Sequence, residues 1–473
     1  MNRQWTLLIL ALGTLCASAR AEDLQTVYEH ALQADPTMQQ AEANHMATRE
    51  AKTQAILNML PLNANASRNW TGVASTTQST PWLGNLGLQV NLFSWDNWVA
   101  LKSANSAVAQ GEADYQAAKQ NLVTRIAQQY FAVLSAEDTL AAQQSALESV
   151  ARQLEQAERR FEVGLIAVTD VQIARASRDS GAAAVIAAKR TLASTKEQLR
   201  ATTGRYYNRL AQPRDGMPLL APEPASEDAW VSTSLSQNAA LTSARLSVDI
   251  AHDSYLTAMG GHLPSITAQA SRSWNLSGNG GNSTQFNQGS GGSGTTPILI
   301  DTQDIIWTVG VTVPLFTAGA TQSLVRQSKY RWNAARAGYD AALRSAEQQA
   351  RDAYQGVISQ IAQVGALKQA VESNQISLQA TEAGYDVGTK TAIDVLTARQ
   401  LLVQAQTNYA QAKYGYLNDI VALRLAAGNL DVSTIKLING WLVEPPPAEN
   451  STPPAMPVAP KAPEATPGAP SAP

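Results

Sequence analysis

The stretch Phe161-Glu162-Val163-Gly164 occurs again, in the same order of aromatic, acidic, valine and glycine, as Tyr385-Asp386-Val387-Gly388, 224 positions later. The same offset aligns several residues downstream of each stretch: Asp170 with Asp394, Arg175 with Arg399 and Leu199 with Leu423. The chain therefore contains two copies of one plan, over residues 22–228 and 229–445. The second copy carries an insertion of about 20 residues within 275–304, and its Gly, Ser and Asn content predicts a loop.

The sequence around each stretch has the spacing of long packed helices. Residues 97–160 and 318–382 contain no proline, and apolar residues recur there every seven positions, as at Ile126, Val133 and Leu140. This spacing predicts two helices of about 64 residues, each about 96 Å long. Shorter helices are predicted over 24–58, 168–203, 230–259 and 392–427. Each copy should therefore place one long helix beside two short ones, with a Val-Gly turn at one end and strands at the other.

Alternating apolar and polar residues predict two strands in each copy. The pattern is plainest over 305–315 and recurs at 86–92, with partner strands at 64–70 and 266–274. About nine to eleven residues is also the length that a tilted strand needs to cross a bilayer. Four strands cannot close a barrel, and open strand edges in lipid would leave backbone groups unpaired. Several chains must therefore associate, as a dimer with eight strands or a trimer with twelve.

The two ends of the sequence have their own character. Arg3, the apolar stretch from Trp5 to Ala17 and Ala19-Arg20-Ala21 predict a secretory signal peptide over 1–21. A lipoprotein signal acylated at Cys16 is the competing interpretation, and Leu15 argues against it because a small residue is expected there. Residues 446–473 are dominated by Pro and Ala, which predicts a disordered tail.

Composition excludes several classes of protein. The 473 residues are 44% hydrophobic and 15% charged, and the formal net charge is −3. No run of five Lys or Arg occurs, which argues against nucleic acid as a partner. One cysteine and four histidines match no metal-site spacing, and no nucleophile or phosphate-loop motif is present. We therefore predict a protein that is not an enzyme and that uses no metal and no cofactor.

Several of these features together resemble the TolC family of outer-membrane efflux and secretion channel proteins. They are the signal peptide, the opening Asp23-Leu24, the Leu-Pro entries to the strands, both Val-Gly turns and the run from Ala383 to Leu396. The resemblance extends over residues 22–440. It implies an α+β membrane protein whose two structural repeats form part of a trimeric, twelve-stranded outer-membrane β-barrel. That barrel would be continuous with a twelve-helix periplasmic α-barrel.

The resemblance also implies a function. A passive duct in the outer membrane of a Gram-negative bacterium, extending into the periplasm, would serve tripartite efflux or type I secretion. It would be gated at its periplasmic end and opened when its partners dock. The implied partners are two further copies in a homotrimer, outer-membrane lipid, a periplasmic adaptor (membrane fusion) protein and an inner-membrane pump of the RND or ABC type. The alternative is a periplasmic coiled-coil structural or adaptor protein without a pore.

The resemblance assigns roles to residues near the two Val-Gly turns. The turn glycines are Gly164 and Gly388, and the aperture gate comprises Arg159, Thr169, Asp170, Tyr385 and Lys390. Tyr385 would donate a hydrogen bond to Asp170, and Lys390 would bind Thr169 or Asp170 of a neighbouring copy, more loosely than the arginine of the family. Plainer interpretations stay open: a heptad core position for Tyr385, a helix N-terminus for Asp170 and a solvated helix charge for Arg159.

Two further roles follow from the resemblance and from composition. Asp394 would add one carboxylate per chain to a pore constriction, although interaction with its helix N-terminus is the plainer interpretation. Thr397 stands where the founding member of the family has a second aspartate, so the ring would hold three carboxylates and select cations more weakly. Trp70, Trp274 and Trp307 are predicted to lie at the membrane interface, with packing within the sheet as the alternative.

Overall fold

The computed structural model describes residues 21–445 except 60–61, 68–69, 74–75, 80–82, 215 and 276–304. The predicted signal peptide up to residue 20, nearly all of the predicted insertion, and the proline-rich tail from residue 446 onward lie outside the described residues.

Each copy of the plan forms helices and strands in the expected order. The first copy comprises α2 (Leu24–Ala34), α3 (Pro36–Leu57), β1 (Leu62–Ser67), β2 (Trp70–Val73), β3 (Thr76–Ser79), β4 (Leu83–Phe93), α4 (Trp95–Glu162) and α5 (Val168–Thr203). After β5 (Gln212–Pro213), the second copy comprises α6 (Glu227–Gln237), α7 (Ala239–Gly260), β6 (Ser265–Asn275), β7 (Ile305–Thr312), α8 (Ala320–Asp386) and α9 (Ala392–Ala426). The described chain ends with α10 (Val432–Asn439) and β8 (Leu442–Val443).

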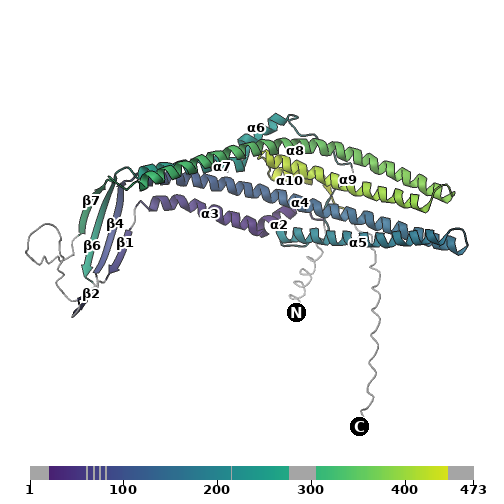
Figure 1. Cartoon of the computed structure of the whole chain (residues 1–473), viewed down its shortest axis with the longest axis horizontal. Coiled ribbons are helices and arrows are strands. Elements are labelled where there is room, and N and C mark those ends of the chain that lie inside the picture. Colours follow the sequence, from purple (N-terminus) through teal and green to yellow (C-terminus); the bar gives the residue numbers. More distant parts are fainter. Residues whose placement is uncertain are drawn as a thin grey trace, which may run out of the picture.

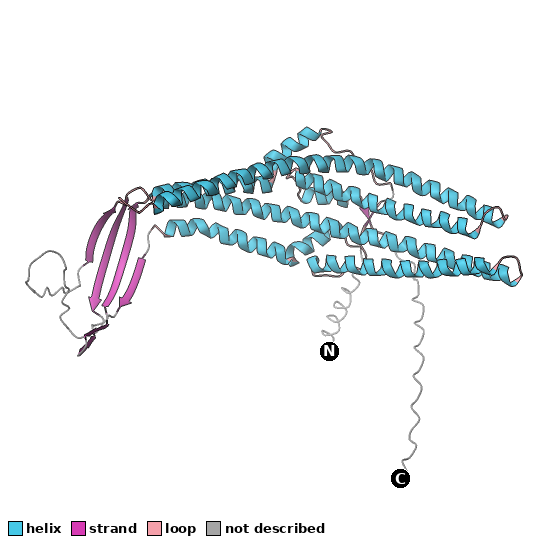
Figure 2. Cartoon of the chain, viewed as in Figure 1, coloured by secondary structure: helices cyan, strands magenta, loops and turns pink. Residues whose placement is uncertain are grey.

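The molecule is long, with its sheet at one end and two helical turns at the other (Figure 1). Helix α4 has 68 residues and α8 has 67, so both slightly exceed the predicted length. Helices α3 and α5 pack along α4, and α7 and α9 pack along α8, as Figure 2 shows. Each long helix therefore lies beside two shorter ones, and α7 also packs against α4. No helix of the described residues is both long enough and apolar enough to traverse a bilayer.

Two of the predicted helices are each divided in two. The helix predicted over 24–58 is interrupted at Asp35, because the ring of Pro36 disfavours helical backbone in the residue before it. The Asp35 carboxylate instead caps α3 by accepting from the amide of Thr37. The helix predicted over 230–259 is interrupted at Asn238, whose side chain caps α7.

Two of the predicted strands are shorter than expected. The strand predicted over 305–315 ends at Thr312, and Pro314 two residues later has no amide hydrogen for a strand ladder. The strand predicted over 64–70 ends at Ser67, and Trp70 begins β2, which pairs with β3 in a separate two-stranded ribbon.

The main sheet is antiparallel, in the order β1-β4-β6-β7, and its two faces differ in polarity. Residues directly opposite each other share a face, and the register aligns Leu62, Leu88, Ala270 and Trp307 across the four strands. The same face carries Leu86, Val90, Ile266, Ala268, Ile305, Val309 and Val311, with Arg272 as its charged exception. The other face carries Asn63, Gln89, Asn91, Thr267, Gln269, Ser271 and Thr308, and also the apolar residue Ile306.

The largest core lies midway along the helices, where α2, α4, α9 and α10 meet. Its fully buried side chains include Tyr130, Phe131 and Tyr416. The Tyr130 hydroxyl donates to the backbone oxygen of Ala211 at 2.7 Å, which ties the strand β5 region to α4. Helix α5 ends in this region at Gly204, which has φ of +72° and closes the helix by donating to Arg200.

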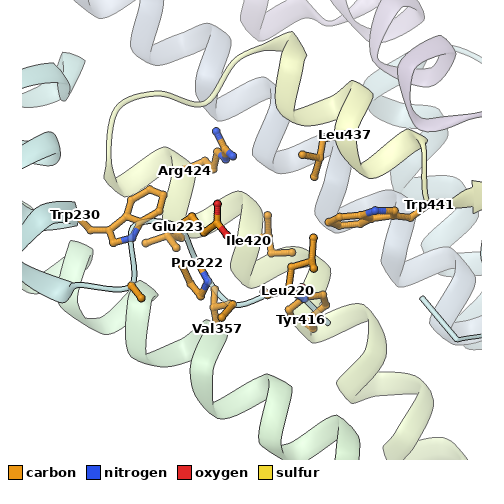
Figure 3. A pocket seen from close by; sticks show the side chains of 13 residues that line it. Leu220, Pro222, Glu223, Trp230, Val357, Tyr416, Ile420, Arg424, Leu437 and Trp441 are labelled. Carbon is orange, nitrogen blue, oxygen red and sulfur yellow. Dashed lines mark hydrogen bonds between the residues drawn. The ribbon is translucent and has the colours of Figure 1, made fainter. Parts of the chain in front are cut away.

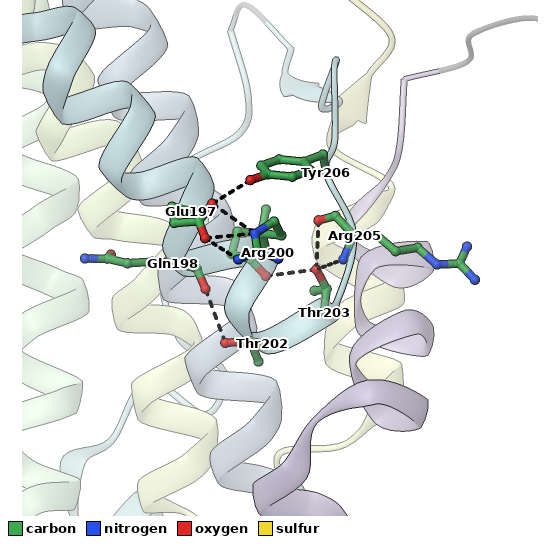
Figure 4. Close-up of polar contacts among 8 residues, drawn as sticks. Glu197, Gln198, Arg200, Thr202, Thr203, Arg205 and Tyr206 are labelled. Atoms are coloured by element: carbon green, nitrogen blue, oxygen red, sulfur yellow. Dashed lines mark hydrogen bonds and ion pairs between the residues drawn. The ribbon is translucent and has the colours of Figure 1, made fainter.

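A polar network covers the end of α5 (Figure 4). Arg200 donates to Glu197 at 2.8 Å, and the Tyr206 hydroxyl donates to the same carboxylate at 2.9 Å. These hydrogen bonds from Arg200 and Tyr206 hold the pKa of Glu197 below its ordinary value. The network fixes the chain as it leaves the helix and turns back toward the core.

Candidate functional site at the paired helical turns

The two Val-Gly stretches form equivalent turns at the far end of the molecule from the sheet (Figure 1). Gly164 has φ of +75° and Gly388 has φ of +78°, a backbone region that strains any residue with a Cβ. The backbone amide of Leu165 donates to the carbonyl oxygen of Arg160 at 2.9 Å, and the equivalent amide of Thr389 donates to the carbonyl oxygen of Gly384 at 2.8 Å. Each glycine therefore ends a long helix and lets the chain return as α5 or α9.

Asp394 lies in the first turn of α9 and is bound there. Its carboxylate accepts from the backbone amide and from the hydroxyl of Thr391, both at 2.8 Å, while the Thr391 hydroxyl accepts from the amide of Asp394 at 3.3 Å. This reciprocal arrangement is a capping box. The hydrogen bonds from the Thr391 backbone and side chain lower the pKa of Asp394, and the nearby charge of Lys390 adds to that effect. Within one chain, Asp394 therefore stabilises the start of α9.

Asp170 occupies the equivalent position in α5 without an equivalent bond. The residue before α5 is Ala167, which has no side chain that could cap the helix. Asp170 is half-buried and Thr169 is exposed, and in the described part of the chain neither side chain forms a hydrogen bond or ion pair with another residue. The carboxylate of Asp170 is therefore available to a group outside this chain.

Arg160 joins the two turns. Its guanidinium lies 3.3 Å from the carboxylate of Asp386 and 5.2 Å from the ring centroid of Tyr385. Arg160 belongs to α4, whereas Tyr385 and Asp386 end α8, so the contact connects the two helical hairpins. The expected bond from Tyr385 to Asp170 is absent among the described residues of the single chain, and Tyr385 packs instead against Val395, Leu402 and their neighbours.

The remaining gate candidates lie at the same end of the molecule. Arg159 forms an ion pair with Glu155 one turn earlier on α4, and both side chains are largely exposed. Lys390 follows the second turn, where its backbone amide donates to Gly384 at 3.2 Å. A bond from Lys390 to Thr169 or Asp170 of a neighbour would require a second chain.

Sequence reasoning missed the contacts that hold the hairpins together. Glu158 and Arg175 form an ion pair at 3.1 Å across the first hairpin, and Glu382 binds Arg399 across the second. The two pairs are related by the offset of 224, so the recurrence of the same two charged residues in both copies indicates the ion pair. The pair of Arg160 and Asp386 has no such duplicate, because the position equivalent to Arg160 is Gly384.

The tryptophans predicted at the membrane interface all lie at the sheet end. Trp70 begins β2, Trp274 belongs to β6 opposite Gly84, and Trp307 belongs to β7 opposite Ala270. The Trp307 side chain is 77% exposed and lies on the apolar face of the sheet. Within the described ranges, no group of three His, Cys, Asp or Glu side chains is placed to hold a metal ion.

Comparison with known families matches this architecture. Residues 27–205 and 230–429 match the family described as outer membrane efflux protein, so both copies of the plan are covered. The chain belongs to this family. Outer membrane protein TolC of Vibrio cholerae serotype O1 is 34% identical over 434 residues, which cover 91% of this chain and 96% of that protein. Alkaline protease secretion protein AprF of Pseudomonas aeruginosa is 26% identical over 425 residues, which cover 87% of this chain and 85% of AprF.

Solved structures share the fold. The outer membrane protein VceC of Vibrio cholerae superposes with a TM-score of 0.70 at 23% identity, over 86% of this chain and 96% of VceC. Membership of the outer membrane efflux family confirms the predicted TolC-family resemblance. It identifies the chain as an outer-membrane exit duct for efflux or secretion and not as an enzyme.

Proposed function

We propose that three copies of this chain form one gated conduit. Twelve strands, four from each chain, would close an outer-membrane β-barrel, and the helices would continue it as a twelve-helix α-barrel through the periplasm. The signal peptide over 1–21 would be removed, residues 22–228 and 229–445 would each supply one hairpin of strands and one of helices, and the tail from 446 would stay outside both barrels.

The main sheet carries this proposal. Its edge strands β1 and β7 each have one neighbour among the described residues, so one side of each is open to pair with another chain. Its apolar face is uncovered, with Leu62, Trp307 and Val309 between 66% and 77% exposed. An apolar outer face and a polar inner face are what a closed barrel requires in lipid. A periplasmic spacer without a pore has no use for such a face.

The helical turns would close the conduit. Tyr385, Lys390, Thr169, Asp170 and Arg159 lie at the end of the helices farthest from the sheet. The Asp170 carboxylate, which forms no hydrogen bond or ion pair within the described part of the chain, would accept from Lys390 or Tyr385 of a neighbouring copy, and Asp394 would contribute one charge per chain at the constriction. Because Thr397 stands where the founding member of the family has a second aspartate, the ring would hold only three carboxylates and would select cations weakly.

Partners would supply the energy, since a passive duct hydrolyses nothing. A periplasmic adaptor and an inner-membrane pump of the RND or ABC type would dock at the helical turns and separate the hairpins. AprF is named for secretion of a protease, and the matched family is described as outer membrane efflux protein, so a secreted protein is one class of cargo for this conduit and small molecules that are pumped out are the other.

Outer-membrane extracts and planar bilayers test the proposal. We expect a heat-modifiable trimer and discrete conductance steps, and we expect Tyr385→Phe combined with Lys390→Ser to raise conductance. A chain that carbonate washes from the membrane, or that stays a monomer in detergent, would contradict the assembly. A trimer whose conductance is unchanged in the double variant would retain the conduit and place the gate at other residues.

A further inference from the structure

A groove beside the core has no role in the conduit proposed above. It encloses about 410 Å³ between α9, α10 and the segment that leads into α6. Its floor consists of the buried side chains Trp230, Val357 and Tyr416, and its rim includes Leu220 and Leu437, which are 54% and 42% exposed. Figure 3 shows Trp230 and Trp441 at opposite ends of the groove. The groove is therefore an elongated apolar surface with an aromatic ring at each end.

Some polar groups of this groove have hydrogen-bond partners within the chain and others do not. The indole of Trp230 donates to the backbone of Pro224 at 2.9 Å, and the Tyr416 hydroxyl exchanges hydrogen bonds with the backbone of Leu220. Among the described residues, the indole N–H of Trp441 has no acceptor and the Glu223 side chain forms no hydrogen bond or ion pair, whereas the charge of Arg424 acts on Asp431 and helps to lower the pKa of that carboxyl. A ligand for this groove should offer apolar rings, a free carbonyl acceptor and charges of both signs.

The proline-rich tail of the same chain has this chemistry. Pro454, Pro457, Pro460 and Pro463 recur at every third position, and Lys461 and Glu464 lie among and just after them. A polyproline II helix has three residues per turn, so these prolines would lie along one edge. Its backbone makes no internal hydrogen bonds, which leaves carbonyl oxygens free to accept from an indole N–H, the mode by which aromatic grooves bind proline-rich segments.

The tail also begins beside the groove. Trp441 lies four residues before Pro445, where the described chain ends, so Pro445 lies within about 14 Å of Trp441. The nine residues from Pro445 to Pro454 span about 28 Å in the polyproline conformation, enough to turn back to the groove. Tethering at this distance gives the tail a high local concentration, so weak contacts suffice to seat it.

We propose that the groove binds the chain's own segment 454–463 as a polyproline II helix, with prolines against Trp230 and Trp441 and Lys461 near Glu223. This inference is independent of the gate and of the number of chains in the conduit.

Disulfide trapping in the full-length protein tests the proposal, since Cys16 in the signal peptide is the sole native cysteine. Leu437→Cys lies on the groove rim, and Ala459→Cys lies within the proline run. Val432→Cys is the matched control, because Val432 is on the same helix, is 41% exposed and does not line the groove. We expect the 437–459 disulfide to form at least tenfold faster than the 432–459 disulfide.

Variants confined to the tail separate docking from simple tethering. Pro457→Gly with Pro460→Gly leaves the folded part untouched and should abolish the rate advantage at position 437. Trp441→Phe keeps the ring and removes the N–H donor, and should slow trapping about fivefold. A synthetic peptide of residues 452–464 should compete, whereas a peptide of the same composition with its prolines out of register should not. Equal rates at 432 and 437, or disulfides formed only between chains, would overturn the proposal.

Discussion

Loss of the contact between the two helical hairpins should open the conduit. Arg160 lies 3.3 Å from Asp386 and 5.2 Å from the Tyr385 ring, and it joins the end of α4 to the end of α8. The Arg160 side chain is 35% exposed and that of Asp386 is 69% exposed, so solvent screens the pair. Asp386→Ala removes the ion pair alone, and Arg160→Ala removes the ion pair and the ring contact together.

The magnitude follows from these exposures. An exposed ion pair contributes about 0.2–1 kcal/mol, and a guanidinium over a half-buried tyrosine ring such as that of Tyr385 adds about 0.5–1 kcal/mol. Asp386→Ala should therefore cost up to about 1 kcal/mol per chain, and Arg160→Ala about 1–2 kcal/mol. If three chains open together, Asp386→Ala shifts the equilibrium by up to about 3 kcal/mol, a change of about a hundredfold in the ratio of open to closed channels.

Single-channel recording at low and high salt is the assay. Open probability should rise in the order wild type, Asp386→Ala, Arg160→Ala, and the difference between wild type and Asp386→Ala should shrink in 1 M salt, where the Debye length falls to about 3 Å. Arg152→Ala is the control, because Arg152 pairs with Glu148 on the same helix and does not link the hairpins. The reasoning is refuted if Arg152→Ala opens the channel as much as Asp386→Ala does, or if the effects of Arg160→Ala and Asp386→Ala add in the double variant.

Three other predictions concern the turns and the sheet. Gly388→Ala should lower the free energy of unfolding by about 1–2 kcal/mol because of the φ of +78° alone, since no atom lies within 4 Å of the added Cβ and a clash is therefore excluded. The control is Gly365→Ala within α8, where the added Cβ also meets no atom, and this variant should raise the melting temperature slightly. Val309→Arg on the apolar face of β7 should reduce insertion into liposomes by about 2–4 kcal/mol, whereas Thr308→Arg on the polar face should insert normally. Hydrogen bonds from Thr391 lower the pKa of Asp394, so the helix cap should persist at pH values below the ordinary aspartate pKa and be lost as the pH falls through the lowered pKa. Loss of the cap should be detected as faster hydrogen exchange of the Thr391 amide. The Asp394→Asn variant should lack this dependence on pH.

Periodicity was sufficient to predict the long helices and the two turns. The heptad spacing of Ile126, Val133 and Leu140 requires a helix whose apolar stripe stays on one side for many turns, and α4 has that form. The interruptions at Asp35 and Asn238 were missed because each stretch was interpreted as one continuous helix. The capping residues carried the information: Asp-Pro at 35–36 and an asparagine at 238 both favour a new helix start.

The contacts between hairpins could not be predicted from spacing. Arg160 and Asp386 are 226 positions apart, and their contact depends on how α4 packs against the hairpin of α8 and α9 and on the rotation of each helix. The ion pair between Glu158 and Arg175 could have been predicted, because both residues recur 224 positions later as Glu382 and Arg399. A repeat that preserves charge as well as shape indicates an ion pair that both copies share.

The edges of β1 and β7, which have no further neighbour in the part of the chain that the structure describes, have a consequence for assembly. If three chains close one barrel as proposed, a single chain could not complete its sheet by itself, and the rate of this last assembly step would depend on how many copies are present at once. A defective copy that can still pair through one edge strand would leave the barrel unclosed, and the normal copies bound to it would be inactive as well. A mutation confined to one edge strand should accordingly behave as dominant when mixed with the normal gene product.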